Sequence, residues 1–160
     1  MAAWLHIGER ATSVRVDDGR QGPQPVTLAV GLLDLGHRYL RHAPPTAGEL
    51  EAAIEAVEDV LMPAIPRLRG PGPLVTADVE SCALLTAAGL PADVQAELDI
   101  HAVERLFNRL VDVAGGRPAA SEDLPVRAGF AANLLILREL MHHAGRTALV
   151  VMPCGADAPS

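Results

Sequence analysis

Residues 4–16 read WLHIGERATSVRV, and this stretch decides the fold prediction. Apolar and polar residues alternate on both sides of the GERA segment, which is typical of two short strands joined by a turn. A third strand is predicted over residues 26–30, after a Gly-Pro-Gln-Pro loop. The triplet Asp17-Asp18-Gly19 predicts the turn before it, because Asp and Gly adopt positive φ at little cost. The chain therefore opens with a predicted three-stranded antiparallel meander.

Beyond residue 30, helical and extended patterns alternate. Residues Thr46 to Glu49 form a capping box, which marks the start of a helix. In the helix that follows, an apolar stripe is predicted to be buried and the acids between its members to face water; the stripe consists of Leu50, Ile54, Val57 and Leu61. Periodicity predicts helices over 31–41, 46–62, 79–88, about 99–114 and 126–144, and strands over 74–77 and 147–152. This order predicts an α/β fold: a mixed sheet of about five strands, opened by the meander, with helices on both faces. We expect one domain over residues 1–155 and a disordered tail over 156–160.

Composition excludes several classes of function. The net charge is −7 and aromatic residues make up 2% of the chain, so we expect no nucleic-acid partner. The sequence has no apolar run of the roughly 20 residues that a membrane helix needs. Cys82 and Cys154 have no metal-site spacing, and neither a disulfide framework nor a metal centre is predicted. Because the first residues also lack the features of a signal peptide, a cytoplasmic protein is expected.

Three segments resemble a known family. Residues 6–14, HIGERATSV, are similar to the family segment D-I-G-G-G-S-T-E-L, and residues 27–40, TLAVGLLDLGHRYL, to S-L-P-L-G-A-V-R-L-T-E-R-F-L. Val126-Arg127-Ala128, before a long helix, resembles an R-A-D segment. Over about residues 4–152 the chain thus resembles the C-terminal lobe of the exopolyphosphatase and guanosine pentaphosphate phosphohydrolase (Ppx/GppA) family. The resemblance implies the ribonuclease H-like fold of an actin-like ATPase lobe.

The chain departs from the family pattern where the family handles phosphate. A glycine-rich turn lets backbone N–H groups approach a phosphate, but Glu9 and Arg10 replace two of those glycines. His6 stands where the family has an Asp. A second family loop, G-T-G-G-T, falls on residues 76–80, TADVE, which have no glycine and two acids. The late S-D-x-G segment falls on residues 151–155, where only Gly155 is kept.

Four residues remain as candidate ligand-binding residues on the resemblance: Gly8, Arg10, Thr12 and Arg127. Arg10 can grip an anion bidentately from the turn, or it can be an ordinary solvated arginine. Thr12 keeps the family identity, but a threonine in a strand is more often structural. No catalytic residue is predicted, and no cofactor.

The pair His142-His143 ends the last predicted helix, where a cation complements the helix dipole. A metal site there would need two further ligands that the sequence does not place, so no metal ligand is predicted.

Three hypotheses about function follow. The first is a pseudoenzyme: a non-catalytic Ppx/GppA-like lobe that acts as a binding or assembly module. It would form a homodimer, or bind another protein chain, through apolar residues of the last helix or the early strands. The alternative is a Mg²⁺-dependent phosphoanhydride hydrolase on polyphosphate or guanosine pentaphosphate or tetraphosphate, with its second lobe supplied by a dimer mate or a partner chain. The third is an unrelated α/β domain with chance similarity. Whether the chain is an enzyme stays open at this point, and the lost phosphate residues favour the first hypothesis.

Overall fold

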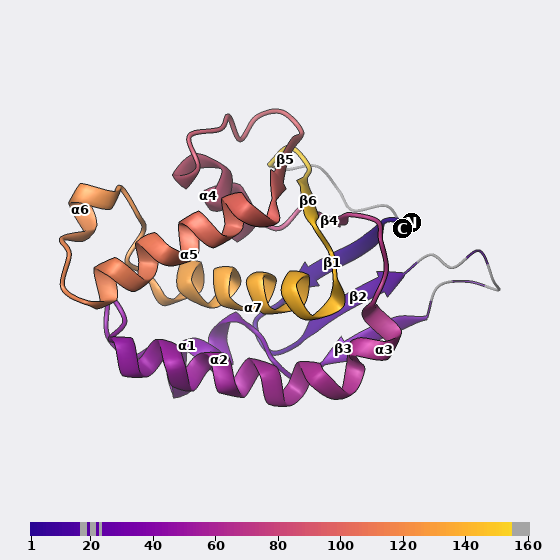
Figure 1. Ribbon diagram of the computed structural model, residues 1–160, viewed down its shortest axis with the longest axis horizontal. Coiled ribbons are helices and arrows are strands. Elements are labelled where there is room, and N and C mark those ends of the chain that lie inside the picture. The colour runs from indigo at the N-terminus through magenta and orange to yellow at the C-terminus, as the bar shows by residue number, and fades with distance from the viewer. Residues whose placement is uncertain (17–18, 20–21, 23, 155–160) are drawn as a thin grey trace.

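The computed structural model describes residues 1–16, 19, 22 and 24–154. A sheet of six strands forms its centre, in the order β3-β2-β1-β4-β6-β5 (Figure 1). The strands are β1 (Ala3–Ile7), β2 (Thr12–Val16), β3 (Pro25–Leu28), β4 (Leu74–Thr76), β5 (Ala96–Asp99) and β6 (Ala148–Val151). The pairs β1–β2, β2–β3 and β5–β6 are antiparallel, whereas β1–β4 and β4–β6 are parallel. The sheet is therefore mixed, and it opens with the predicted three-stranded meander.

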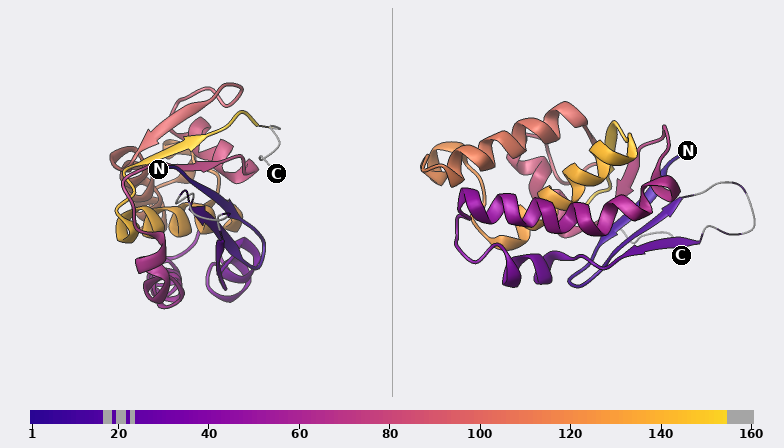
Figure 2. Two further views of the ribbon diagram at one scale, coloured as in Figure 1. Left: turned by 90° about the vertical axis from the view of Figure 1, so that its right-hand side faces the viewer. Right: turned by 60° about the horizontal axis from the view of Figure 1, so that its bottom comes forward.

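One long helix organises the helical layer. α7 (Ala128–Ala144) contacts α1 (Leu32–Arg38), α2 (Ala47–Leu61), α4 (Val79–Ala87) and α5 (Ile100–Ala114). Figure 1 shows α7 in front of the sheet, between α5 and α2. The remaining helices are the short η1 (Met62–Ala64), α3 (Ile65–Leu68) and α6 (Ala119–Glu122). The right-hand view of Figure 2 shows α2 running along the outside of this layer. The fold is thus the expected α/β arrangement of a mixed sheet and helices.

The meander has one buried and one open face. Leu5, Ile7 and Val14 are buried under the helical layer, while their neighbours His6 and Arg15 are exposed. This is the alternation that predicted the strands from the sequence. The predicted turn at Asp17 and Asp18 lies outside the described residues, as does the predicted tail at 156–160.

The strand β5 was not predicted. The sequence does alternate apolar and polar residues there, over residues 94–100, VQAELDI, so the period-of-two signal was present and was missed. Leu98 is the one buried residue among the four of the strand. β5 lies at the edge of the sheet and pairs only with β6. The expected count of about five strands is corrected to six.

The helix α2 confirms its predicted start but corrects its predicted faces. Thr46 Oγ1 accepts a hydrogen bond from the Glu49 amide at 3.2 Å, as in a capping box. The buried positions are Leu50, Ala53, Val57 and Leu61, so the stripe runs through Ala53, and Ile54 is only partly buried at its margin. Glu58 was expected to face water, but it reaches His143 on α7.

The last helix cannot supply the expected apolar interface. Its large apolar side chains, from Phe130 to Met141, are buried inside the molecule by the surrounding helices and the sheet. The expectation took their apolar character as a sign of an exposed surface, whereas α7 is hydrophobic on nearly every side because it is the central core helix.

Cys82 and Cys154 form a disulfide, which corrects the expectation of no disulfide. The bond ties the segment after β6 to α4, with a Cα–Cα distance of 6.2 Å. The two residues are separated by 72 positions, and only the fold brings them together. No helix of the described residues is long and apolar enough to cross a membrane.

Candidate functional site

The β1–β2 turn rests on the start of α1. Within the turn, the Gly8 amide donates to the Ala11 carbonyl at 2.9 Å. The amide of Leu32 donates to the Gly8 carbonyl at 2.9 Å, and that of Leu33 to the Glu9 carbonyl at 2.8 Å. The first N–H groups of a helix are the ones that bind anions when they are free. At α1 the turn's own carbonyls already accept these hydrogen bonds.

This seating requires a glycine at position 31. A Cβ there would lie 2.5 Å from the Glu9 carbonyl carbon and 2.6 Å from the Arg10 nitrogen, both of them backbone atoms. The φ of Gly31 is −151°, so the demand is for space and not for a left-handed backbone.

We expect Gly31→Ala to destabilise the protein by about 1–3 kcal/mol, because the turn must move off α1 to make room. The matched control is Gly48→Ala in the first turn of α2, where a Cβ meets nothing within 4 Å. That change should be neutral or slightly stabilising. Urea unfolding of both variants measures the difference, and equal effects would contradict the described contact.

The loop between β4 and α4 places a carboxylate at the end of β1. Asp78 Oδ2 accepts a hydrogen bond from the Ile7 amide at 2.7 Å, and Asp78 Oδ1 lies 2.6 Å from His6 Nδ1. The Asp78 side chain is 14% exposed and its own amide donates to Thr76 Oγ1 at 3.1 Å. Asp78 therefore binds both the last backbone amide of β1 and the neighbouring imidazole.

A second carboxylate, in the first turn of α4, pairs with the arginine that precedes α7. Arg127 donates from Nε to Glu80 Oε1 at 3.2 Å and from its terminal nitrogen to Glu80 Oε2 at 2.9 Å. This is a bidentate pair, the strongest common geometry between arginine and a carboxylate. Glu80 also lies against α7, since a Cβ on Gly129 would be 3.1 Å from Glu80 Oε1.

The four candidate residues occupy different environments. Gly8 and Arg10 lie in the β1–β2 turn, and Arg10 is exposed. Thr12 is fully buried, and its hydroxyl donates to the Val30 carbonyl at 2.8 Å, so it joins β2 to the chain after β3. Arg127 lies across from the turn, at the start of α7. The fold brings the turn and Arg127 to the same end of the molecule, while the Thr12 hydroxyl is used inside it.

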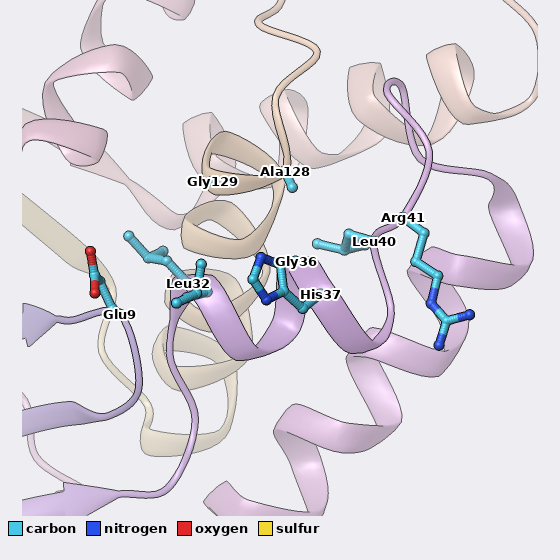
Figure 3. Close-up of a pocket in the computed structure, with 9 residues that line it drawn as sticks. Glu9, Leu32, Gly36, His37, Leu40, Arg41, Ala128 and Gly129 are labelled. Carbon is cyan, nitrogen blue, oxygen red and sulfur yellow. The ribbon is translucent and has the colours of Figure 1, made fainter.

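A pocket of about 560 Å³ separates the turn from the start of α7. α1 forms most of its wall, with an apolar surface from Leu32, Leu33 and Leu40, and Ala128 and Gly129 close it on the α7 side. Figure 3 shows Glu9 and Arg41 at opposite ends of the row of lining residues, with His37 between them. The volume is within the range of small-molecule sites, about 300–1,000 Å³.

Sequence reasoning missed this pocket. It singled out neither His37 nor Arg41 as a candidate residue. Arg41 lies three residues beyond the end of α1, so helical spacing does not place it beside His37, and no local pattern indicates their shared wall.

Comparison with solved structures shows which fold this is. The chain superposes on a Ppx/GppA family member from Aquifex aeolicus with a TM-score of 0.72 and 15% identity, covering 96% of this chain and 52% of that one. An exopolyphosphatase from Cytophaga hutchinsonii gives a TM-score of 0.72 at 14% identity, covering 95% of this chain and 53% of that one. An exopolyphosphatase-like protein gives 0.70 at 13% identity, with coverage of 94% and 54%. The chain therefore has a Ppx/GppA-like fold, as the sequence resemblance implied.

The chain spans about half the length of the solved structures that it matches. No family model matches the sequence, and no curated protein does.

Proposed function

We propose that this chain is a non-catalytic Ppx/GppA-like lobe that acts as a binding or assembly module. One observation carries the proposal: two donors at the end of β1, and the arginine before α7, are bound by the chain's own carboxylates. Asp78 takes the Ile7 amide and His6, and Glu80 takes Arg127.

Catalysis of phosphoryl transfer rests on cations and oriented donors that contact the phosphate. In this lobe a phosphate would have to displace Asp78 from the Ile7 amide and Glu80 from Arg127, and it would meet both carboxylates beside it. Arg10 is the arginine of the turn, and it is exposed. A solvated arginine alone does not position a phosphate for transfer.

The hydrolase hypothesis remains the second candidate, and the pocket lined by His37 and Arg41 favours it. Two of the similar structures are described as exopolyphosphatase or exopolyphosphatase-like, and this chain covers only about half of each. A hydrolase built on this lobe would need Mg²⁺ and a second lobe from a dimer mate or a partner chain. It would act on polyphosphate or on guanosine pentaphosphate or tetraphosphate.

The proposal predicts no specific binding of a short phosphate chain. We expect calorimetric titration of the wild type with tripolyphosphate to give no saturable heat at ordinary ionic strength. The Glu80→Gln variant, which frees the Arg127 guanidinium, should bind better than the wild type. Saturable micromolar binding by the wild type that Arg127→Ala abolishes would contradict the proposal.

The assembly part of the proposal concerns the same end of the molecule. Val79 is 77% exposed and Val126 is 41% exposed, and each precedes one member of the Glu80–Arg127 pair. Both valines would add apolar area to a contact surface at this end, and a two-fold dimer is the commonest way in which a soluble chain covers such an area. We propose that two copies of the chain form a homodimer through this end of the molecule. The alternative is that another protein chain binds the same surface.

We expect sedimentation at micromolar concentration to give a dimer that Val79→Asp dissociates. Val111→Asp on α5 is the matched control, because Val111 is also exposed, at 40%, but lies on another surface. A monomeric wild type with no co-purifying chain, or equal dissociation by both variants, would overturn the proposed surface.

A further inference from the structure

Three side chains that can hold a metal ion meet between α2 and α7. Glu139 and His143 are four residues apart on α7 and so share one face of that helix. Glu58 reaches them from α2. The Nε2 atom of His143 lies 3.1 Å from Glu58 Oε1 and 3.2 Å from Glu139 Oε2. All three donor atoms lie within 4.8 Å of one another.

A hydrogen bond from the His143 imidazole does not explain this arrangement well. The Nε2 position of an imidazole carries at most one N–H, and here it faces two carboxylates at nearly equal distance. One N–H can serve both oxygens only as a bent, three-centre hydrogen bond, which is weaker than a straight one. A metal ion held by the Nε2 lone pair would contact both carboxylates at once.

The charges around the cluster also leave a surplus of carboxylate. Glu139 is 3% exposed, and a carboxylate so deeply buried needs a compensating charge. Arg138 is the arginine in contact with it, but Arg138 also donates to Glu104 Oε1 at 2.9 Å. One guanidinium is thus shared between Glu104 and Glu139, and Glu58 adds a third carboxylate. A divalent cation would remove the imbalance.

Arg138 fixes the orientation of the buried carboxylate. Its terminal nitrogen binds Glu139 Oε1, which leaves Glu139 Oε2 directed at His143. The guanidinium is itself held over the Phe107 ring, 4.0 Å from its centre. Outer contacts of this kind orient the ligands of protein metal sites.

We propose that Glu58, Glu139 and His143 bind a divalent transition ion of the Zn²⁺ class and thereby join α2 to α7. With bonds of about 2.0–2.1 Å to nitrogen and oxygen, a tetrahedral zinc site has ligand atoms about 3.3 Å apart. The two distances from His143 Nε2, 3.1 and 3.2 Å, are close to that value. The Glu58 side chain is 40% exposed, so water can occupy the fourth position.

This site is independent of the proposed function. It lies toward the C-terminal end of α7, whereas the pocket and Arg127 lie at the N-terminal end of that helix. Neither the loss nor the presence of phosphate binding decides whether the ion binds.

Titration of the chelator-treated protein with Zn²⁺ alone, by calorimetry near neutral pH, tests the proposal. We expect one ion per chain. His143→Gln and Glu58→Gln should each weaken binding by at least about 10-fold, and both should keep the wild-type circular dichroism spectrum. His142→Gln is the matched control, because His142 is exposed and neighbours His143 without joining the cluster. Its affinity should equal that of the wild type.

Co²⁺ in place of Zn²⁺ gives a second readout, since its visible spectrum reports the coordination geometry. A four-coordinate spectrum that disappears in His143→Gln would support the site. Mg²⁺ in excess should not compete, because it requires octahedral oxygen ligands. Absence of saturable Zn²⁺ binding, or binding that His143→Gln leaves unchanged, would overturn the proposal.

Discussion

Replacing Arg146 by methionine is expected to lower the free energy of unfolding by several kcal/mol, because each buried carbonyl left without a partner costs about 1–3 kcal/mol. Arg146 is 1% exposed and follows the end of α7. It donates to the carbonyls of Leu68 at 3.0 and 3.2 Å, of Met1 at 2.9 Å and of Gly72 at 3.0 Å. The side chain thus holds the N-terminus, the end of α3 and the loop before β4 together.

No carboxylate pairs with Arg146 among the residues that the structure describes. Burial lowers the pKa of its guanidinium, but an arginine stays charged in any ordinary solution. Backbone carbonyls are what stabilise this charge. Methionine has a similar length and no donor, so it would leave those carbonyls buried without partners.

Urea unfolding of Arg146→Met beside Arg67→Met measures this effect. Arg67 is exposed on α3, and its replacement should change stability by less than about half a kcal/mol. Similar losses in the two variants would show that the Arg146 contacts contribute little.

Reduction of the Cys82–Cys154 disulfide is expected to cost about 4 kcal/mol. The bond closes a loop of 72 residues. Such a loop lowers the conformational entropy of the unfolded chain, which stabilises the folded state by about 4 kcal/mol at 25 °C. Urea unfolding with and without a reductant should therefore give clearly different midpoints.

The double variant Cys82→Ala with Cys154→Ala is the control, and the reductant should leave its midpoint unchanged. A wild type whose midpoint is equally insensitive would argue that the bond is absent in solution. A disulfide that forms in the cell would favour an oxidising compartment over the expected cytoplasm.

The parts of the fold that could be predicted from the sequence are those with local signals. The meander shows a period of two around residues 4–16, and Thr46 with Glu49 marks the start of α2. β5 carries such a signal as well, since residues 94–100, VQAELDI, alternate apolar and polar, and sequence reasoning missed it. The stripe of α2 was shifted toward Ile54 because the sequence could not show that Ala53 packs directly against its neighbours.

The loops of the candidate site could be named from the family resemblance, but their contacts could not be predicted. The exchange of glycines for Glu9 and Arg10, and the acids at 78 and 80, could be recognised as changes in phosphate loops. Their partners could not, since the Asp78–Ile7 bond joins residues 71 positions apart and the Glu80–Arg127 pair spans 47. The same holds for Glu58 and His143, which are 85 positions apart. Long-range pairs of this kind are set by the topology of the sheet and leave no mark on local sequence.

The most direct test of the central claim is the release of phosphate by the purified chain with polyphosphate, and separately with guanosine pentaphosphate, in the presence of Mg²⁺. Because Asp78 and Glu80 hold the donors that a phosphate would need, we expect no release above the rate in buffer alone. Release that Arg10→Ala or Arg127→Ala abolishes would contradict a non-catalytic lobe and would establish the hydrolase in its place.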